Sequence, residues 1–461
     1  MSQRRLSLLQ AVSVNMAMMV GVGPFITIPL FVATMGGPQS MVGWVLGAIV
    51  AICDGLVWSE LASAFPGSGG TYHFFDAIYG SRWLGRMLKF LFAWQFLFSG
   101  PLEIASGALG LGLYAAYLYP PLKGAAWTLG SWTVTYSQLG AIVAVVGIVM
   151  LAYRRIEAAG KLMVIFWAGM LITVGIVLVA AWSNFDPKLA FAFPPNAWKL
   201  DKKFAIGLGA ALGIAMYDFL GYYQVCYLGD EVDNPSKTIP QSILISVLAV
   251  SALYLIMNLG ILGVIPWREV IPSQSIASDL LNRVWGSRSA TIMTWMIIWT
   301  GIAATFSAIL GYSRIPYAAA KSGHFFRGLA ATHPTGGFPH RSLILIGGVT
   351  ALACLANLET VITALLASRI LIQFVGQIVT ICYLRTQPEL AAKLRFRMWL
   401  FPLPAIVALL GWLWVFGASA AMIQFYGLVS ALVGFVVFLI WDGKRLTTET
   451  QRHREEKTIE D

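Results

Sequence analysis

Charged residues are scarce in this chain. Only 11% of its 461 residues are Asp, Glu, Lys or Arg, whereas 58% are hydrophobic and the mean hydropathy is +0.74. A soluble domain of this length cannot cover so much apolar surface with so few polar side chains. The scarcity of charge therefore excludes a soluble globular protein, and we predict an all-α polytopic membrane protein.

Cysteines and the motifs of metal, phosphate and cofactor sites are also few. The four cysteines fall in apolar segments without metal-ligand spacing, so we predict no disulfide and no metal site. The stretch "PGSGGTYHF" lacks the Lys-Ser/Thr pair of a P-loop, and His73 in it is expected to be an ordinary loop histidine. "GDEVDNP" lacks the ligand spacing of a calcium loop. With no nucleophile elbow, zinc motif or dinucleotide fingerprint, we expect neither an enzyme nor a cofactor.

Long apolar runs are abundant. A membrane-spanning helix needs about 20 apolar residues, and runs suited to twelve such helices occur at 8–35, 40–64, 86–118, 134–152, 158–182, 203–227, 240–264, 290–317, 342–358, 361–384, 397–416 and 419–441. We predict one integral-membrane domain over residues 1–441, followed by a polar tail at 442–461. The lipid bilayer is then an obligatory partner.

The Lys and Arg residues are distributed unevenly between the two sides of these runs. If the N-terminus is cytoplasmic, 21 of the 31 Lys and Arg residues lie inside and 8 lie outside. The positive-inside rule favours this orientation, with both termini cytoplasmic in a cell membrane. The same distribution explains the net charge of +10 without a nucleic-acid partner.

Two of the apolar runs contain helix breakers deep inside them. "VGVGPFITIP", residues 20–29, carries Gly21, Gly23 and Pro24, and "LGIAMYDFLGYY", residues 212–223, carries Asp218 and Gly221. The first stretch alone also fits a packing face of small residues. Non-helical backbone at membrane depth is tolerated where it is buried or lines a cavity. Breaks at corresponding positions of two halves are typical of inverted-repeat transporters, whose sites suit a small zwitterion or amine.

Four motifs in order resemble those of a known family. They are "GVGPF", "WSELASAFPGSGGTY", "YLGDEVDNPSKTIPQSI" and "LRTQPEL" followed by "LRFRMWLFPLPA". Over essentially its whole length the chain resembles the amino acid–polyamine–organocation (APC) permeases. The resemblance implies a LeuT-like five-plus-five inverted repeat, with repeats at about 6–182 and 202–385 and extra helices at about 397–441. It also implies transport by alternating access.

The resemblance also implies site residues. In the family, amides of helix 1 hold a substrate carboxylate, and carbonyls of both breaks hold the amino group. The matching residues are Gly21, Val22, Gly23, Pro24 and Phe25 in helix 1, and Met216, Tyr217, Asp218, Phe219 and Gly221 in helix 6. Lys161 matches a lysine that replaces a sodium ion in many members, although a lysine at this depth also fits snorkelling to the interface. Pro24 departs from the usual isoleucine and removes one N–H that could meet a carboxylate.

Ionisable side chains deep in apolar runs are costly, by about 2.5–3.5 kcal/mol on insertion scales, and each is a functional hypothesis. We expect Asp218 to bind a substrate amine or a coupling proton, the alternative being a cap for a freed backbone N–H. Glu103 fits a second cation ligand, a proton site or a salt bridge. Arg369 needs a carboxylate partner, for which Glu103, Asp54, Asp218 and a substrate carboxylate are candidates. Glu60 is expected to anchor the loop that follows it.

The sequence thus predicts a secondary active permease for amino acids, coupled to protons or working by exchange. A polyamine or related organocation permease is the alternative within the same class, favoured by Asp218, Glu103 and Pro24 and opposed by Arg369. A membrane sensor that binds substrate without moving it is the alternative from another class.

Overall fold

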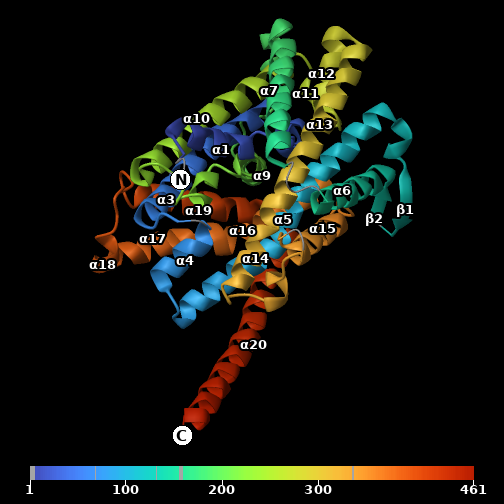
Figure 1. Ribbon diagram of the computed structural model, residues 1–461. Coiled ribbons are helices and arrows are strands. Elements are labelled where there is room, and N and C mark those ends of the chain that lie inside the picture. Colours follow the sequence, from blue (N-terminus) through green and yellow to red (C-terminus); the bar gives the residue numbers. More distant parts are fainter. Residues whose placement is uncertain (1–5, 68, 131, 155–158, 335–336, 461) are drawn as a thin grey trace.

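The structure, a computed structural model, is almost entirely helical (Figure 1). It describes residues 6–67, 69–130, 132–154, 159–334 and 337–460, and within these ranges the side chains of 154, 159–167 and 444–460 are not described. The first half contains α1 (Leu8–Met19), α2 (Gly23–Met35), α3 (Val42–Ala64), α4 (Thr71–Tyr79), α5 (Trp83–Leu118), α6 (Tyr136–Arg154) and α7 (Ala159–Ser183). The second half contains α9 (Lys202–Phe219), α10 (Pro235–Leu262), α12 (Ile276–Trp285), α13 (Ser287–Tyr312), α14 (Arg314–Lys321), α15 (His340–Ala353), α16 (Leu358–Arg369), α17 (Gly376–Thr386), α19 (Leu403–Ala418) and α20 (Ala421–Glu460).

The first apolar run is broken where the sequence predicts it. Its two parts, α1 and α2, are separated by residues 20–22 and bent by 56°. Pro24 lies in the first turn of α2. A proline is well tolerated there, because the N–H that it lacks has no partner within a helix. The proline and the two glycines therefore shape the start of a second helix and do not simply distort one long helix.

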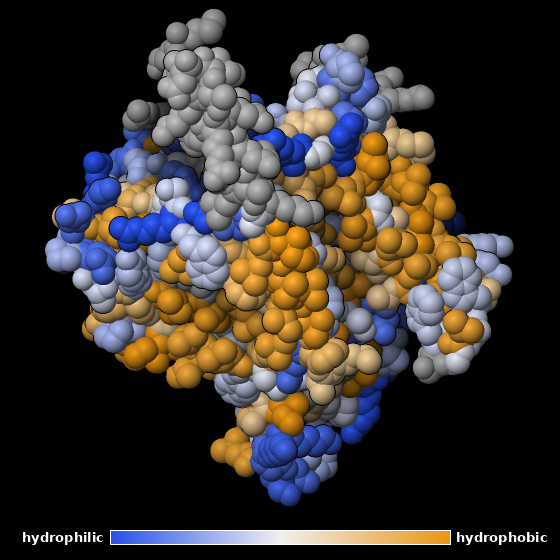
Figure 2. All heavy atoms as spheres, turned by 90° about the horizontal axis from the view of Figure 1, so that it is seen from below, coloured by the Kyte–Doolittle hydropathy of each residue, from blue (hydrophilic) through white to orange (hydrophobic). Residues whose placement is uncertain are grey.

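Many of the predicted spans are long apolar helices in the structure. Within the described part of the chain, seven helices are long and apolar enough to cross a membrane, or eight if the bent pair is one span. Four other predicted spans coincide with shorter helices, namely the described part of α7, α9, α15 and α19. Large apolar side chains are exposed on outer helices, and Figure 2 shows a broad hydrophobic surface on the face seen from below. The chain is a polytopic helical membrane protein.

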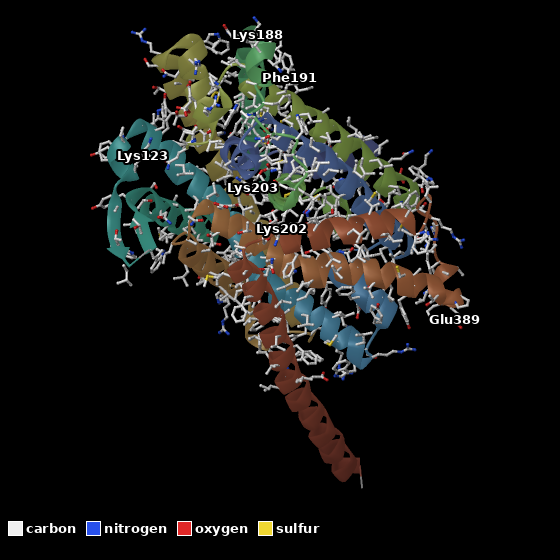
Figure 3. All side chains as sticks on the ribbon, turned by 180° about the vertical axis from the view of Figure 1, so that it is seen from behind. Lys123, Lys188, Phe191, Lys202, Lys203 and Glu389 are labelled. Atoms are coloured by element: carbon white, nitrogen blue, oxygen red, sulfur yellow. The ribbon has the colours of Figure 1, made fainter. Side chains whose placement is uncertain are left out.

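Two small elements lie outside the main helices. Strands β1 (Ala125–Leu129) and β2 (Trp132–Thr135) form an antiparallel hairpin in which Thr128 pairs with Thr133. This hairpin was not predicted. The short helices α11 (Trp267–Val270) and α12 lie between α10 and α13. In Figure 3, Lys123 before the hairpin and Glu389 in α18 (Pro388–Ala391) lie on opposite sides of the molecule.

Helix α3 holds the two broken runs together. Added Cβ atoms at Gly43 and Gly47 would lie 2.7 and 2.9 Å from the side chains of Ala211 and Ala215 in α9. Small residues at such a crossing let helix backbones approach closely. On the same face, the ring of Trp44 lies 5.1 Å from Phe31 of α2 and 5.7 Å from Phe219 of α9. The crossing therefore places α2 and α9 side by side.

Buried ion pairs fix helices that are distant in sequence. Glu60 of α3 accepts two hydrogen bonds from the Arg385 guanidinium, at 2.7 and 2.8 Å, and one from the Met398 backbone N–H at 2.9 Å. Glu60 therefore anchors the segment between α17 and α19, which is not the loop that we expected. Arg86 of α5 pairs in the same bidentate way with Asp442 of α20.

Candidate functional site

The two breaks predicted from the sequence meet in space. Asp218 lies in the last turn of α9, and its Oδ2 accepts a hydrogen bond from the Thr27 hydroxyl of α2 at 2.6 Å. An added Cβ at Gly23 would lie 2.6 Å from Asp218 Oδ1 and 3.8 Å from the Tyr217 ring. Only glycine lets α2 begin this close to the carboxylate. Three of the predicted site residues, Gly23, Tyr217 and Asp218, therefore share one location.

The Asp218 carboxylate is buried and only partly satisfied. Its residue is 3% exposed, and within the described chain its Oδ1 has no hydrogen-bond partner. In the described chain the Thr27 hydroxyl is its hydrogen-bond partner, and no freed backbone N–H donates to it as the alternative hypothesis of a cap requires. It lies beside the N-terminus of α2, where the helix dipole favours negative charge. One carboxylate oxygen is thus left to accept from another group.

The first break is held from both sides by tyrosines of neighbouring helices. The Tyr254 hydroxyl of α10 donates to the Met19 carbonyl at 2.7 Å, and the Tyr114 hydroxyl of α5 donates to the Phe25 carbonyl at 3.0 Å. These contacts satisfy carbonyls that the break or its surroundings would leave free. The side chains of Val22 and Phe25 are buried.

The backbone amides at the break itself are free to donate. Among the described residues, the N–H groups of Gly21 and Val22 donate no hydrogen bond. An added Cβ at Gly21 would meet nothing within 4 Å. Unpaired N–H groups at a helix N-terminus form an anion-binding site. The break therefore carries a donor set close to the start of α2.

The second break begins after Phe219 and turns at Gly221. Gly221 has φ +109°, which favours glycine, and an added Cβ there would lie 2.6 Å from Met18 of α1. The side chain of Asn15 in α1 accepts from the Val225 N–H at 2.8 Å. Met216 and Phe219 are fully buried in the packing around α9. The two broken runs therefore hold one another on both sides of the candidate site.

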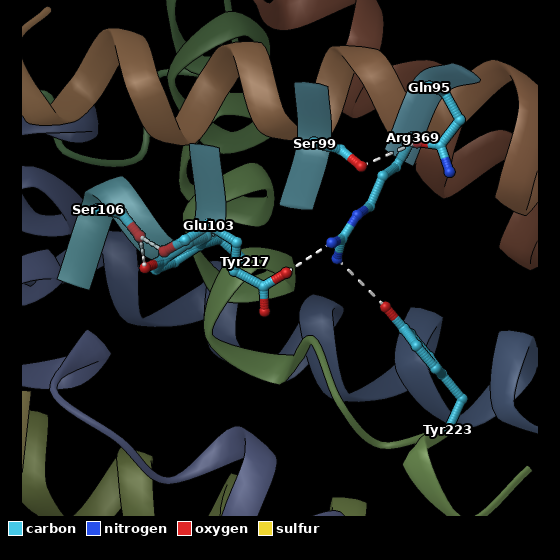
Figure 4. A network of polar contacts seen from close by, with 7 residues as sticks. All are labelled: Gln95, Ser99, Glu103, Ser106, Tyr217, Tyr223 and Arg369. Atoms are coloured by element: carbon cyan, nitrogen blue, oxygen red, sulfur yellow. Dashed lines mark hydrogen bonds and ion pairs between the residues drawn. The ribbon is translucent and has the colours of Figure 1, made fainter. Parts of the chain in front are cut away.

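A polar network extends from this site towards α16 (Figure 4). Arg369 Nη2 donates to Glu103 Oε2 at 2.6 Å, and Arg369 Nη1 donates to the Tyr223 hydroxyl at 3.4 Å. The Tyr217 hydroxyl lies 2.7 Å from the Ser106 hydroxyl, which in turn donates to the Glu103 carbonyl at 2.6 Å. The network connects Tyr217, the neighbour of Asp218, with the ion pair.

The Arg369–Glu103 ion pair shows which of the candidate carboxylates in the chain is the partner of Arg369. Glu103 is the partner, whereas Asp218 accepts from Thr27 and Asp54 accepts from Tyr222 and Trp412. Arg369 is 2% exposed, and its guanidinium carbon lies 5.7 Å from the centre of the Phe96 ring. Arg369 ends α16, and the π-helix η6 (Ile370–Val375) follows directly. Such π-helical turns are frequent at functional sites.

A cavity of about 420 Å³ lies close to this site. It is lined by residues of α2, α9, α16, α19 and the start of α20, among them Leu30, Gly213, Leu366 and Val415. Gly213 precedes Asp218 on α9, and Leu366 precedes Arg369 on α16 by about one turn. The cavity therefore reaches the helices that carry both charged groups.

The sequence model of a family described as "Amino acid permease" matches residues 6–448. The chain belongs to the amino acid permease family. The match confirms the resemblance drawn from the four motifs, and it makes the protein a transporter rather than an enzyme.

Individual relatives agree with this assignment. The permease is 29% identical over 368 residues to an uncharacterized transporter of Mycobacterium tuberculosis, which covers 77% of this chain and 75% of the relative. It is 23% identical over 448 residues to the serine/threonine exchanger SteT of Bacillus subtilis, covering 96% of this chain and 97% of SteT. It is 24% identical over 347 residues to the branched-chain amino acid permease BcaP of Bacillus subtilis, covering 72% of each chain.

Two predicted residues of the permease lie outside the candidate site as described so far, and three residues of the site were not predicted. Lys161 lies in α7, but its side chain is outside the described part of the structure, so its role stays a prediction. His73 lies in α4 and not in a loop, with its ring against Gly67. Sequence reasoning missed Thr27, Ser106 and Tyr223, because polar residues in apolar runs mostly satisfy backbone carbonyls and carry no charge signal.

We expect Gly23→Ala to impair this permease. The added methyl must displace the Asp218 carboxylate or α2, and such overpacking typically costs about 1–3 kcal/mol, so uptake should fall roughly 10-fold or more. The measurement is the initial rate of amino acid uptake at matched protein levels. Gly140→Ala in α6 is the control, because an added Cβ there meets nothing within 4 Å. Equal effects of both changes would show that the closeness of Gly23 and Asp218 is unimportant.

Proposed function

We propose that this permease is a secondary active transporter that moves small zwitterionic amino acids by alternating access. The observation that carries the proposal is that the breaks hold both a carboxylate oxygen and backbone N–H groups that lack hydrogen-bond partners. Asp218 Oδ1 has no partner in the described chain, and the N–H groups of Gly21 and Val22 likewise have none. An α-amino acid presents an ammonium and a carboxylate close together, and these two groups match that arrangement.

Asp218 is proposed to bind the substrate ammonium. A buried carboxylate oxygen without a partner is costly in the membrane, and a charged donor compensates that cost. The Thr27 hydroxyl holds the other oxygen and so fixes the orientation of the carboxylate. Gly23 supports the role by leaving room beside Asp218, and Gly221 by letting the chain turn immediately after α9.

The substrate carboxylate is proposed to bind the N–H groups of Gly21 and Val22. The helix dipole at the start of α2 adds favourable electrostatics for an anion there. Pro24 does not weaken this role, because it lies in the first turn of α2 beyond these two amides. Phe25, Met216 and Phe219 are buried, and we assign them to shaping the walls of the site.

Glu103 and Arg369 are proposed to form a polar wall of the same site. Arg369 is paired with Glu103, and the Ser106–Tyr217 contact joins this pair to the neighbour of Asp218. The Glu103–Arg369 ion pair also disfavours a polyamine as the substrate. A diamine or longer polyamine needs carboxylates for both ends, and Glu103 already neutralises a guanidinium. In the described chain neither Asp218 nor Asp54 has a basic partner, and of these two only Asp218 leaves a carboxylate oxygen without a hydrogen bond, because Asp54 accepts from Tyr222 and Trp412.

The membrane arrangement is part of the same proposal. We infer twelve transmembrane helices in a cell membrane with both termini in the cytoplasm, arranged as two repeats, about 6–182 and 202–385, plus two further helices. The charge distribution of the loops supports this orientation. The coupling is proposed to be to protons or by exchange, and the similarity to SteT, a serine/threonine exchanger, supports the second of these. Lys161 remains a candidate for coupling.

The proposal is tested by transport into proteoliposomes that contain the purified permease. Labelled serine, leucine and putrescine are offered with an inward proton gradient, with unlabelled amino acid inside, or with neither. We expect serine or leucine to accumulate under at least one of the first two conditions, and putrescine under none. Binding of an amino acid without any accumulation would instead indicate a sensor. Accumulation of putrescine alone would overturn the assignment of Asp218 to an amino acid ammonium.

A further inference from the structure

Five carboxylates inside the described helix bundle, four of them buried and Glu103 19% exposed, fall into two groups. Glu60, Glu103 and Asp442 each face a guanidinium, that of Arg385, Arg369 and Arg86 respectively. Asp54 and Asp218 face no Lys or Arg side chain in the described chain. Asp218 borders the breaks and is assigned to the substrate ammonium. Asp54 is left without a role in the proposed transport cycle.

Asp54 lies in the middle of α3 and is 1% exposed. Its Oδ2 accepts a short hydrogen bond from the Tyr222 hydroxyl, and its Oδ1 accepts from the Trp412 indole N–H at 3.2 Å. Both donors are neutral groups. The other titratable groups that face it are Cys53 on its own helix and Tyr223 in the segment after α9.

An ionised carboxylate in such surroundings is only moderately compensated. Two neutral donors stabilise the charge, whereas burial in the membrane disfavours it. A neutral carboxylic acid fits the same space, since it adds one hydrogen atom and removes the charge. The site can therefore exist in two protonation states without rearrangement of α3.

We propose that Asp54 is the proton-binding group that couples substrate movement to a proton gradient. The proposal rests on the transport function proposed above. The Asp54 carboxylate takes up one proton from the outer aqueous side and becomes a carboxylic acid, and it later releases that proton to the inner side. No other bond forms or breaks, and one positive charge moves inward with each substrate molecule.

Protonation changes the contact with Tyr222. The ionised carboxylate only accepts, so the Tyr222 hydroxyl donates to it. A carboxylic acid has its own O–H, and when this O–H points at the Tyr222 oxygen the tyrosine accepts and turns its own hydrogen elsewhere. Tyr222 directly follows Gly221, the turning point of the second break. A change in the protonation state of Asp54 therefore changes a hydrogen bond to Tyr222, four residues after Asp218.

Trp412, the second donor to Asp54, connects this carboxylate to η6. Its ring stacks on that of Phe374 in η6, with 3.8 Å between the ring centres. The π-helix η6 begins directly after Arg369, so the Trp412 ring links Asp54 to the segment that follows Arg369. Val415, about one turn after Trp412 on α19, lines the 420 Å³ cavity. Asp54 thus contacts one residue of the second break, Tyr222, and one residue of α19, the helix that carries Val415.

The test compares gradient-driven accumulation with exchange in proteoliposomes. Asp54→Asn keeps the shape of the side chain but cannot bind and release a proton. We expect it to lose at least 10-fold of the accumulation driven by an inward proton gradient, while exchange of labelled for unlabelled amino acid stays within about twofold. Asp442→Asn is the matched control, because it also neutralises a buried carboxylate but one paired with Arg86 at the start of α5. It should retain both activities.

Each remaining outcome is informative. Gradient-driven accumulation by Asp54→Asn at the wild-type level overturns the proposal, as does a wild-type permease that exchanges amino acids but ignores the gradient. A wild-type permease that does neither overturns the proposed function itself. If Asp54→Asn does not fold, Tyr222→Phe replaces it. Loss of the hydroxyl donor should raise the pH of half-maximal gradient-driven accumulation, and an unchanged pH profile would contradict the role of Asp54.

Discussion

Asp218→Asn is expected to reduce amino acid uptake by roughly 100-fold. The change keeps the size of the side chain and its contact with Thr27, but removes the charge that faces the substrate ammonium. Loss of one partner from a buried charge pair costs about 2–5 kcal/mol, and 1.4 kcal/mol corresponds to a tenfold change. The measurement is the initial rate of uptake over a range of substrate concentrations, in gradient-driven and in exchange mode. Both modes should fall together.

The loss of both modes distinguishes Asp218 from Asp54, for which only the gradient-driven mode is expected to fall. Asp442→Asn again serves as the control for removal of a buried carboxylate. Substrate-induced thermal stabilisation should also disappear in Asp218→Asn, because the ammonium has no counter-charge. Wild-type uptake by this variant would mean that Asp218 does not bind a charged group of the substrate.

Arg369→Gln is expected to destabilise the permease by about 3–5 kcal/mol. The change leaves Glu103 as a charge in the bundle interior without its guanidinium partner, and breaking a buried pair from one side typically costs this much. The double variant Glu103→Gln/Arg369→Gln should recover most of the stability, because both charges are gone and two amides can hydrogen-bond. The measurement is thermal or denaturant unfolding of the purified protein at one detergent concentration.

Uptake separates the two roles that Arg369 could have. We expect uptake of the double variant to recover to within about 10-fold of wild type, because the substrate charges bind elsewhere, on Asp218 and the amides of α2. A stable double variant without uptake would show that Arg369 or Glu103 contacts the substrate directly. A double variant as unstable as the single one would contradict the pairing.

The local features of the fold could be predicted from the sequence because their causes are local. Gly21, Gly23 and Pro24 disfavour continuous helix at that point of the chain itself, and the structure breaks at residues 20–22. The second break was expected between residues 212 and 223, and α9 ends at Phe219. The rule that charges are rare in lipid likewise identified Asp218, Glu103 and Arg369 from the chain alone.

The partners of these groups could not be predicted. Arg369 and Glu103 are separated by 266 positions, and four acceptors were equally consistent with the sequence. The choice depends on how α5 and α16 pack, which no local pattern encodes. The contacts of Thr27 and Tyr222 were missed for a related reason, since a hydroxyl in an apolar run can hydrogen-bond its own helix or another one. The β1–β2 hairpin was not predicted, because apolar and aromatic residues dominate its sequence as they dominate the neighbouring helices.

The separation between Glu60 and its partners has a consequence for biosynthesis. Arg385 follows Glu60 by 325 positions, and Met398 by 338. The ribosome therefore completes α3 long before the groups that neutralise its carboxylate exist, and the same is true of Glu103 in α5. A carboxylate in a freshly inserted helix disfavours a lipid-facing position, so we expect these two carboxylates to stay out of the lipid until α16 and α17 are made. A chain interrupted before α16 would carry both acids without the guanidinium groups that neutralise them.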